Sequence, residues 1–528
     1  MPTRARARAG FPAPGAPGES ELGTIDAMRL SKLIADLPAA VCLEPGDPQI
    51  RAVVCDSRGA GPGSLFVAVR GQRADGHRYL EAAAAAGAAA ALVEEEDVPR
   101  SGVVRVLVPD TEVALGRAAA AFWGHPSRQL RLVGITGTNG KTTTAYLIQH
   151  LLEAAGIRAG RMGTVSYAYP RGEEPAPLTT PDAPTLQGAL ARMVREGARA
   201  AVLEVSSHSL VRRRVEGCRF ACAVFTNLTQ DHLDYHGSMD AYFEAKLLLF
   251  ARYARGAPAV VSAEDPYGER IRAQAEQVGS PVITFGLERG DVRLAVEALT
   301  TAGVRGHACY PGGSAPVEVP LVGEHNARNA ACALAAAVAL GLDGEAAARA
   351  LARAPQVPGR VEAVPNGAGL SVFVDYAHTP DALYRVLEAL RRLATGRLLC
   401  VFGCGGDRDR GKRPLMAEAA ARWADALVLT ADNSRSEPTA AILTEIERGL
   451  PPQWRPAADA AGLRENQRYL KRPDRREAIH LAVAAVQPGD ALVIAGKGHE
   501  TTQTLGERVL AFDDRREARA ALAAREAA

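Results

Sequence analysis

The chain has 528 residues, of which 47% are hydrophobic, and a net charge of +2. This length predicts several globular domains with large cores, and the near-neutral charge excludes a strong general attraction to nucleic acid or anionic membranes. The eight cysteines include no CxxC pair, so we expect buried thiols in a reducing compartment. No run of 18 apolar residues is present, so we expect no membrane-spanning helix.

The first part of the chain predicts a tail followed by a small α/β domain. Residues 1–24 are rich in Arg, Pro, Ala and Gly and lack the apolar segment of a secretory signal, so we expect a disordered tail. Between residues 25 and 130, short apolar runs at 52–58, 63–69 and 90–96 alternate with an alanine-rich helical segment. Strands that alternate with helices predict a mostly parallel sheet.

The second part, residues 131–355, opens with a predicted phosphate-binding loop. The apolar run 131–137 has strand character, and the segment 141–156 has helical spacing and ends in glycine. Between them lies GITGTNGKTTT, which differs from the usual GxxxxGK[ST] pattern because Ile135 occupies the position of the first glycine.

The residues of this loop predict how it would hold a nucleotide. Gly137 and Gly140 let the backbone N–H groups turn toward one anion, and the helix N-terminus adds its positive end. Lys141 is expected to reach the β- and γ-phosphates, and the Thr142 hydroxyl to bind Mg²⁺. An ordinary glycine-rich turn is the alternative. The candidate ATP-binding residues here are Gly137, Thr138, Asn139, Gly140, Lys141, Thr142 and Thr143.

Two further predicted strands carry or precede polar residues of interest. Glu204 lies inside the apolar run 201–205, and His232 follows the run 222–227. A carboxylate buried in a strand is costly unless it is paired, and Mg²⁺ beside ATP phosphates is a suitable partner. Hydrogen-bonded core residues are the alternative interpretation.

Residues 238–254 predict an amphipathic helix with a lysine in its apolar stripe. Lys246 falls four residues after Tyr242 and four before Phe250, on the same face. A buried ammonium group is costly and needs pairing, neutralisation or chemical modification. The alternative is that the side chain extends to the edge of the stripe and keeps its charge in water.

The last part, residues 356–528, predicts a second parallel α/β sheet with a ligand site at one edge. Polar clusters directly follow four apolar runs, at 375–378, 403–408, 432–435 and 496–500. Open α/β sheets bind ligands at the carboxyl ends of their strands, so these clusters predict a binding surface. Four solvated loops are the alternative.

In order along the chain, these motifs resemble those of the Mur ligases of peptidoglycan synthesis. They include EVSSHSL, FTNLTQDHLDYHG, EAKLLLF, VDYAHTPD, FGCGGDRDRGKRPLM, DNSRSE and AGKGHE, and the resemblance covers all but the N-terminal tail. It implies a three-domain α/β architecture. An N-terminal UDP-binding domain is expected at 25–130, a central P-loop ATPase-type parallel sheet at 131–355, and a C-terminal Rossmann-like domain for an amino acid at 356–528.

The resemblance also implies roles for single residues. Lys246 matches a lysine that is carbamylated in the family and helps to hold Mg²⁺, while Glu204 and His232 match Mg²⁺ ligands; together with Lys141 they are the candidate catalytic residues. The residues that match nucleotide contacts are Asn326, Arg360, Asp375 and His378. Those that match contacts to the UDP-muramoyl-dipeptide are Ser57, Gln72, Thr179, Thr180, Ser206, Arg212 and Arg214. Those that match the pocket for the incoming amino acid are Arg408, Asp432, Asn433, Arg435, Gly496 and Glu500.

Within the family, the motifs look most like those of the ligases that join UDP-N-acetylmuramoyl-L-alanyl-D-glutamate to meso-diaminopimelate. The implied reaction uses ATP and Mg²⁺: the D-glutamate carboxylate is phosphorylated, and the amine displaces phosphate from the acyl phosphate. Ligation of lysine or another amino acid is one alternative, and a non-catalytic ATP-binding protein is another. We further expect a cytoplasmic monomer without nucleic-acid or membrane partners.

The expected amino-acid specificity depends on arginine. A guanidinium binds a carboxylate through two parallel hydrogen bonds, so Arg435 and Arg408 suit the distal carboxylate of diaminopimelate, and Glu500 suits its ammonium group. The chain departs from the family pattern at Ser434, where proline is usual, at Arg212, where glutamine is frequent, and at Leu178, where a polar residue is common. We expect a less rigid specificity loop at Ser434 because proline would fix φ.

Overall fold

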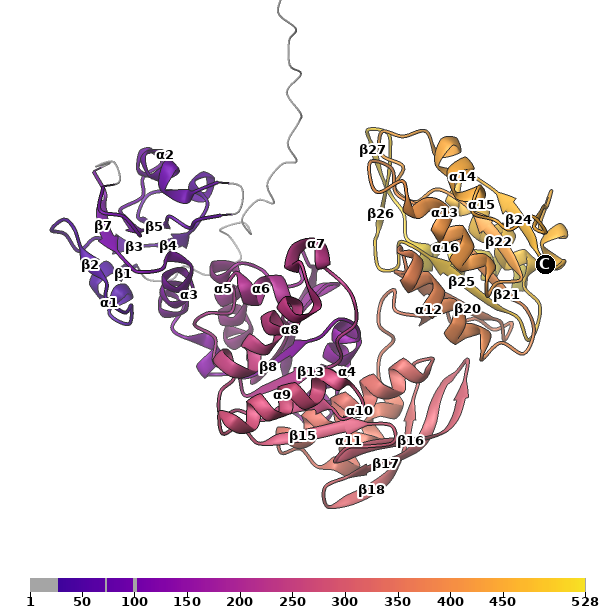
Figure 1. Cartoon of the computed structure of the whole chain (residues 1–528), viewed down its shortest axis with the longest axis horizontal. Helices are drawn as coiled ribbons and strands as arrows, with labels where there is room; N and C mark the ends of the chain where they lie inside the picture. The colour runs from indigo at the N-terminus through magenta and orange to yellow at the C-terminus, as the bar shows by residue number, and fades with distance from the viewer. Residues whose placement is uncertain (1–26, 72–73, 98–101, 528) are drawn as a thin grey trace, which may run out of the picture. The chain divides into compact units, whose positions relative to one another are not determined.

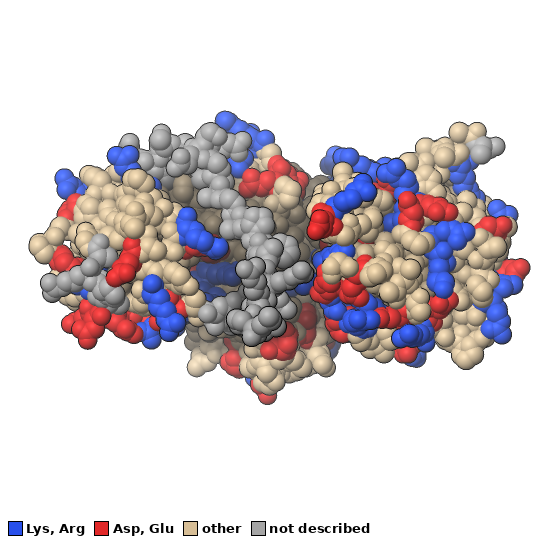
Figure 2. Space-filling view, turned by 90° about the horizontal axis from the view of Figure 1, so that it is seen from above, with Lys and Arg blue, Asp and Glu red and all other residues tan. Residues whose placement is uncertain are grey.

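The computed structural model describes residues 27–71, 74–97 and 102–527 (Figure 1). The predicted disordered tail, residues 1–24, and the predicted substrate contact Gln72 lie outside these ranges. Within them, no helix is both long and apolar enough to cross a bilayer. Figure 2 shows acidic and basic side chains intermixed over the face in view, as expected from the small net charge.

The first sheet has five strands in the order β2-β7-β6-β5-β4. They are β2 (Val41–Cys42), β4 (Ala52–Val54), β5 (Ser64–Val67), β6 (Ala90–Val93) and β7 (Val104–Leu107). Strands β4 to β7 are parallel, and β2 pairs antiparallel with β7. Side chains alternate across the sheet, so Leu65 and Val67 pack with helix α3 (Thr111–Phe122), whereas Phe66 packs with α2 (Leu80–Ala85).

The second sheet has eleven strands in the order β11-β10-β9-β12-β8-β13-β14-β15-β16-β17-β18. The strands β9, β12, β8 and β13 are mutually parallel, and β16 to β18 form an antiparallel meander. Their bounds are β8 Arg131–Thr136, β9 Ala159–Met162, β10 Ser166–Tyr169, β11 Gly172–Pro175, β12 Ala200–Glu204, β13 Cys222–Phe225, β14 Ala259–Ser262, β15 Val282–Gly286, β16 Val292–Thr300, β17 Gly303–Tyr310 and β18 Gly313–Val319.

Helices connect these strands and carry much of the candidate site. Their bounds are α4 Lys141–Ala154, α5 Ala183–Arg195, α6 Ser207–Val211, α7 Leu233–His236, α8 Met239–Leu248, α9 Pro266–Gln277, α10 Glu324–Ala339 and α11 Gly344–Ala350. The helix predicted over 238–254 begins as α8 and changes to π-helical geometry over η4 (Leu249–Tyr253). Such π-segments occur often at functional sites.

The third sheet has seven strands in the order β19-β20-β25-β21-β22-β24-β23. They are β19 Glu362–Ala363, β20 Ser371–Asp375, β21 Leu398–Phe402, β22 Ala426–Leu429, β23 Arg455–Pro456, β24 Arg468–Lys471 and β25 Ala491–Ala495. All neighbours are parallel except β19 and β20. A short hairpin of β26 (Thr502–Leu505) and β27 (Arg508–Ala511) follows.

Helices cover both faces of the third sheet (Figure 1). On one face, α12 (Pro380–Arg391), α13 (Lys412–Ala421) and α14 (Thr439–Glu447) pack over Phe373 and Cys400. On the other, α15 (Arg475–Ala485) and α16 (Asp514–Glu526) pack over Val372 and Leu399. The predicted α/β class is confirmed, and each sheet falls within one of the three predicted segments, whose boundaries stay predictions.

Candidate active site

The predicted phosphate loop joins β8 to α4, as the sequence indicates. Gly137 has φ of 145° and Gly140 has φ of 84°, a region that side chains disfavour. A side chain at position 137 would also clash with the Thr226 hydroxyl. Both glycines are therefore required by the backbone path, and Lys141 and Thr142 begin the helix.

The segment that follows β13 supports this loop. The Asn227 carbonyl accepts a hydrogen bond from Thr138 N at 2.9 Å, and its side-chain oxygen accepts one from Asn139 N at 3.0 Å. The Thr138 hydroxyl donates to the Thr229 carbonyl at 3.1 Å. The sequence did not predict this supporting role of Asn227, whose only signal is its position after a strand.

Two lysines converge on the backbone of the loop. The Lys141 Nζ donates to the carbonyls of Gly137 and Thr138, each at 2.9 Å. The Lys246 Nζ donates to the same Gly137 carbonyl at 2.8 Å. Lys246 is only 1% exposed, which confirms the predicted burial and excludes the alternative in which its ammonium group reaches water.

The environment of Lys246 favours its neutral form. Burial, followed by the nearby Lys141 ammonium, holds the pKa of Lys246 well below its usual value, and Asp231 opposes this only in part. The Tyr242 ring centroid lies 4.4 Å from Nζ. An uncharged amine enclosed beside a phosphate loop is chemically a nucleophile.

Glu204 ends β12 and is fully buried. Its carboxylate accepts hydrogen bonds from Thr164 N at 3.0 Å and from the Thr164 hydroxyl at 3.1 Å. Thr164 was not singled out from the sequence, because it lies 40 positions away on another connection. The buried carboxylate is thus held in place, with oxygen atoms of the kind that Mg²⁺ binds.

His232 precedes α7 in a left-handed conformation with φ of 50°. Its side chain is 48% exposed, and its ring lies 4.9 Å from that of His208. Within the part of the chain that the structure describes, no three His, Cys, Asp or Glu side chains form a metal-binding group. The predicted Mg²⁺ ligands Thr142, Glu204, His232 and Lys246 include only two of these types.

Four of the predicted dipeptide contacts lie close together beside Glu204. The Thr180 hydroxyl donates to the Glu204 carbonyl at 2.8 Å and accepts from Ser206 N at 3.1 Å. Arg214 donates to the Thr180 carbonyl at 2.8 Å. The Thr179 and Thr164 hydroxyls lie 3.1 Å apart. Because Glu204 pairs with Ile135 of β8, these hydroxyl and guanidinium groups lie near the phosphate loop.

The other predicted substrate contacts are more dispersed. Arg212 forms an ion pair with Glu112 of α3 at 3.1 Å, so part of its hydrogen-bonding capacity is already used. Ser57 begins the short 3₁₀ helix η1 (Ser57–Gly59) after β4 and is half-buried. Leu178 is 48% exposed, and its carbonyl accepts from the Tyr167 hydroxyl at 2.6 Å.

The predicted nucleotide-binding residues outside the phosphate loop lie in two separate places. Asn326 on α10 is buried, and its amide donates to the Val322 carbonyl at 2.9 Å. Asp375 ends β20, where its carboxylate accepts from Val361 N and Ala377 N, both at 2.8 Å. Burial raises the pKa of Asp375, while Arg360 acts in the opposite direction.

The surroundings of Asp375 contain two more predicted residues. The buried Arg360 Nε has no hydrogen-bond partner among the described residues, and its guanidinium lies 5.4 Å from the Tyr376 ring centroid. His378 Nδ1 lies 2.7 Å from the Tyr376 carbonyl. An unpartnered buried guanidinium nitrogen suits a site that binds an anionic ligand.

The predicted amino-acid pocket lies at the carboxyl ends of β21, β22 and β25. Asn433 donates to Glu500 at 3.0 Å and accepts from Thr504 N at 2.9 Å. Asp432 accepts from Asn433 N at 2.6 Å, and a side chain at Gly496 would lie 3.1 Å from the Asp432 carboxylate. Lys497, which the sequence analysis missed, is fully buried and pairs with Glu500 at 2.7 Å.

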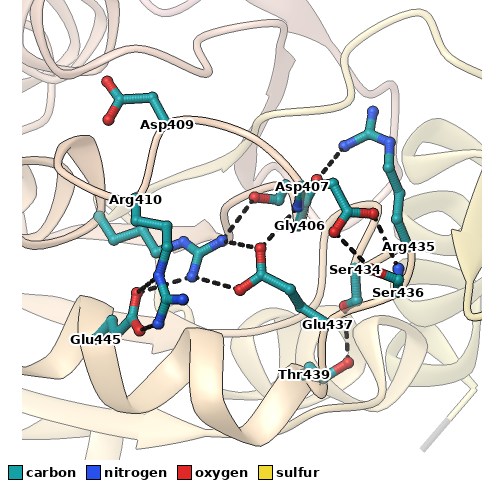
Figure 3. Close-up of polar contacts among 12 residues, drawn as sticks. Gly406, Asp407, Asp409, Arg410, Ser434, Arg435, Ser436, Glu437, Thr439 and Glu445 are labelled. Carbon is teal, nitrogen blue, oxygen red and sulfur yellow. Dashed lines mark hydrogen bonds and ion pairs between the residues drawn. The ribbon is translucent and has the colours of Figure 1, made fainter. Parts of the chain in front are cut away.

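Arg435 links two loops of this pocket, as Figure 3 shows. Its Nη1 donates to the Gly406 carbonyl at 2.7 Å, and its backbone is left-handed with φ of 47°. The same two loops are joined a second time, because the Asp407 carboxylate accepts hydrogen bonds from Ser436 N at 3.1 Å and from the Ser436 hydroxyl at 2.6 Å. Arg408, by contrast, is exposed and hydrogen-bonds no described residue through its side chain.

A buried arginine, Arg413 on α13, forms hydrogen bonds with both of these loops. It is fully buried and donates to Glu437 at 2.9 Å, to Glu445 at 2.7 Å and to the Gly405 carbonyl at 3.2 Å. Glu437 in turn accepts from Asp407 N at 2.7 Å (Figure 3). No local pattern predicts the two ion pairs of this network, because Glu437 and Glu445 lie 24 and 32 positions from Arg413.

The side chain of Ser434 contacts the helix that follows its loop. Its side chain is buried, and its hydroxyl lies 2.7 Å from the Thr439 hydroxyl at the start of α14 (Figure 3). This contact with the next helix is a restraint on the same segment, and the expectation of a less rigid loop without proline stays a prediction.

Comparison with known proteins identifies the family of this chain. Three family models match: the Mur ligase family catalytic domain at 49–123, the Mur ligase middle domain at 135–337 and the Mur ligase glutamate ligase domain at 359–498. The UDP-N-acetylmuramoyl-L-alanyl-D-glutamate–2,6-diaminopimelate ligase of Geobacter metallireducens is 43% identical over 90% of this chain and 94% of its own. The ligase of the same name from Geobacillus thermodenitrificans is 44% identical over 94% and 99%.

Solved structures agree with the sequence matches. A UDP-N-acetylmuramoyl-L-alanyl-D-glutamate–2,6-diaminopimelate ligase aligns with a TM-score of 0.70 and 33% identity, over 95% of this chain and 99% of the other. Folylpolyglutamate synthase of Mycobacterium tuberculosis, complexed with ADP, shares the fold at a TM-score of 0.56 and 22% identity, over 73% of this chain and 91% of the other. On these matches, the chain belongs to the Mur ligase family.

Proposed function

We propose that the protein is an ATP-dependent ligase that joins meso-diaminopimelate to UDP-N-acetylmuramoyl-L-alanyl-D-glutamate in peptidoglycan precursor synthesis. The observation that carries this proposal is the convergence of Lys141 and the enclosed Lys246 on the carbonyl of Gly137 in the phosphate loop. Relatives named for this reaction match nearly the whole chain and support the choice of substrates.

The residues of the loop would handle the phosphoryl group. The backbone N–H groups of the loop and the N-terminus of α4 bind phosphate oxygens, and Lys141 exchanges its two carbonyl partners for them. As the γ-phosphoryl group passes to the D-glutamate carboxylate, negative charge gathers on its oxygens, and Lys141 stabilises that charge. The amine of the amino acid then attacks the acyl carbon, and phosphate leaves.

Carbamylation would turn Lys246 into a metal ligand. Its neutral amine adds to the carbon of CO₂, which forms an N–C bond and releases one proton. The product is an anion, so the burial problem of the ammonium group is replaced by pairing with Mg²⁺. Thr142, Glu204, His232 and the modified Lys246 would then hold Mg²⁺, which supplies charge neutralisation on the ATP phosphates when bound.

The amino-acid pocket supports diaminopimelate over lysine. The Nη1 of Arg435 is hydrogen-bonded to Gly406, which orients the guanidinium for a carboxylate. Glu500, oriented by Lys497 and Asn433, can accept from the distal ammonium group. Lysine has no distal carboxylate, so it would leave Arg435 without this partner. Ligation of lysine remains the second candidate because it needs no other change in the site.

A nucleotide-activated precursor and ATP are both consumed, so we place the enzyme in the cytoplasm, and we propose that it acts as a monomer. Neither nucleic acid nor a membrane has a role in the reaction.

The test is phosphate release by the purified protein with UDP-N-acetylmuramoyl-L-alanyl-D-glutamate, ATP and Mg²⁺. Diaminopimelate, lysine and ornithine are compared as amine donors. We expect turnover with diaminopimelate to exceed the others by at least about a hundredfold, the discrimination expected when a buried charged group loses its partner. Equal turnover with lysine would favour the second candidate, and no phosphate release with any amine would exclude both.

A further inference from the structure

A large hollow lies away from the residues assigned above. It has a volume of about 740 Å³ and is lined by residues of α3, of the connection 125–128, of the loop 216–219 and of η4. An adjoining hollow of about 500 Å³ shares Arg128, Arg219 and Tyr253 with it. We call the two together the arginine hollow.

The arginine hollow lies at the opposite edge of the sheet from the phosphate loop. Arg131, which lines it, is the first residue of β8, and Ala221 immediately precedes the parallel strand β13. The phosphate loop follows the other end of β8. A strand of six residues spans about 20 Å, so a ligand in the hollow does not contact the reacting phosphates.

The charge in the hollow is strongly unbalanced. Six arginines line it, whereas only Glu216 and Asp36 supply carboxylates: the arginines are Arg117, Arg128, Arg131, Arg219, Arg252 and Arg255. Glu216 is already occupied by two of them, with Arg117 at 3.2 Å and Arg252 at 2.7 Å.

The other four arginines are available for a ligand. The side chains of Arg128, Arg131, Arg219 and Arg255 form no ion pair or hydrogen bond with any residue that the structure describes, and all four are exposed. Like charges gathered around one concave surface repel each other and raise the local concentration of anions. The loops that carry them are nevertheless fixed, because Arg219 N donates to the Ser127 hydroxyl at 3.0 Å.

We propose that the arginine hollow is a second binding site, for a small anion that carries several phosphate groups, such as inorganic polyphosphate or a nucleoside polyphosphate. Guanidinium groups bind phosphate through paired hydrogen bonds, and four uncommitted ones suit a ligand with more than one phosphate. The volume is that of a site for a small molecule, and a concave surface fits such a ligand better than a flat bilayer.

The first test is calorimetric titration of the full-length protein with inorganic tripolyphosphate. A Lys141→Ala background weakens binding at the phosphate loop. In that background, Arg128→Ala/Arg219→Ala is compared with Arg293→Ala/Arg305→Ala, which removes the same charge from exposed strand positions of β16 and β17. We expect the Kd to rise about tenfold or more in the first variant and to stay unchanged in the control, because charge-assisted contacts are lost only in the first.

A second variant, Arg131→Ala/Arg255→Ala, repeats the test at the other end of the hollow and should also weaken binding. Equal Kd values in the hollow variants and the control would overturn the proposal. Phosphatidylglycerol vesicles serve as the second probe. Vesicle binding that needs Arg128 and Arg219, without tripolyphosphate binding, would also overturn it, because the ligand would then be a membrane headgroup.

Discussion

At the scale of single residues, Lys246 shows how an unfavourable group can be stably placed. A buried ammonium without a carboxylate partner destabilises a fold, and among the described residues the Lys246 Nζ donates its hydrogen bond to the Gly137 carbonyl. Helical spacing predicted its burial, but only the folded chain brings it against the phosphate loop. The position is explained if the side chain is modified or neutral.

We expect Lys246→Ala to lower kcat by at least about a hundredfold, since a group that stabilises transferred charge is lost. Protein equilibrated with ¹³C-bicarbonate should give a carbamate resonance in the unmodified sequence and none in the variant. Added formate or acetate should restore part of the activity by supplying a carboxylate. Full activity of the alanine variant, with an unchanged melting temperature, would exclude the carbamate.

Substitution of Arg435 tests whether this residue selects diaminopimelate. Arg435→Lys should lower kcat/KM for diaminopimelate about ten- to a hundredfold, because a bidentate pair with the distal carboxylate is lost. Turnover with lysine should change much less. Arg448→Lys, at an exposed position directly after α14, is the control. An unchanged rate with diaminopimelate would remove the basis for assigning specificity to Arg435.

At the scale of elements, the two loops after β21 and β22 form one unit. Arg413 joins Glu437 and the Gly405 carbonyl, so the loop with Arg408 and the loop with Arg435 are tied to the same buried guanidinium. The hydroxyl pair of Ser434 and Thr439 adds a contact to the next helix. The pocket is therefore held by side chains that do not touch the ligand.

The hydroxyl pair can be measured by a double-mutant cycle. Ser434→Ala and Thr439→Val should each reduce stability, with a coupling energy of about 1 kcal/mol, the net value of a typical hydrogen bond. Ser434→Pro should be tolerated, since the Ser434 N–H donates no hydrogen bond to a described residue. Urea denaturation gives these energies. A coupling near zero would show that the two hydroxyls do not restrain the loop.

The lowered pKa of Glu437 predicts that the stability of the protein depends on pH. Arg413, chiefly through its hydrogen bond, lowers the pKa of Glu437 from its usual 4.5 to about 2. A lowered folded-state pKa stabilises the protein above the unfolded-state value, and this contribution is lost as the pH falls toward the folded-state pKa. The stability difference between the natural sequence and Glu437→Gln should therefore be constant above about pH 5 and shrink below 4.5.

The control for this measurement is Glu418→Gln, an exposed carboxylate of α13 with no ion pair to a described residue. This substitution removes one carboxylate without changing a contact of Arg413. A difference for Glu437→Gln that is independent of pH would contradict the effect of Arg413 on this carboxylate.

At the scale of the whole molecule, the third sheet is self-contained. Its seven strands all come from residues 362–495, and helices cover it on both faces. Apart from Val322, the buried residues of its two cores all lie between residues 361 and 522. This part is expected to fold without the rest.

A fragment of residues 356–528 should unfold cooperatively in urea, because it keeps all the buried residues of both cores except Val322. Trp454, which is buried against one core, reports the transition by fluorescence. A fragment of residues 398–528, which lacks the internal strand β20 and helix α12, should not fold. Gradual unfolding of the longer fragment would contradict the predicted domain boundary near residue 356.

The local pattern of the sequence was enough to predict several features. Strand and helix periodicity predicted the α/β class, and the strand–glycine–lysine–helix order located the phosphate loop. Helical spacing placed Lys246 in an apolar stripe. These features depend on neighbours within a few turns or one strand, so the sequence by itself determines them.

The tertiary structure alone decided which distant groups meet. Thr164 orients Glu204, Arg413 secures the specificity loops, and Lys497 pairs with Glu500. The arginine hollow likewise combines residues of five separate segments. Such partners are chosen by packing and by the satisfaction of buried polar groups, which depend on the whole fold and leave no periodic signal in the sequence.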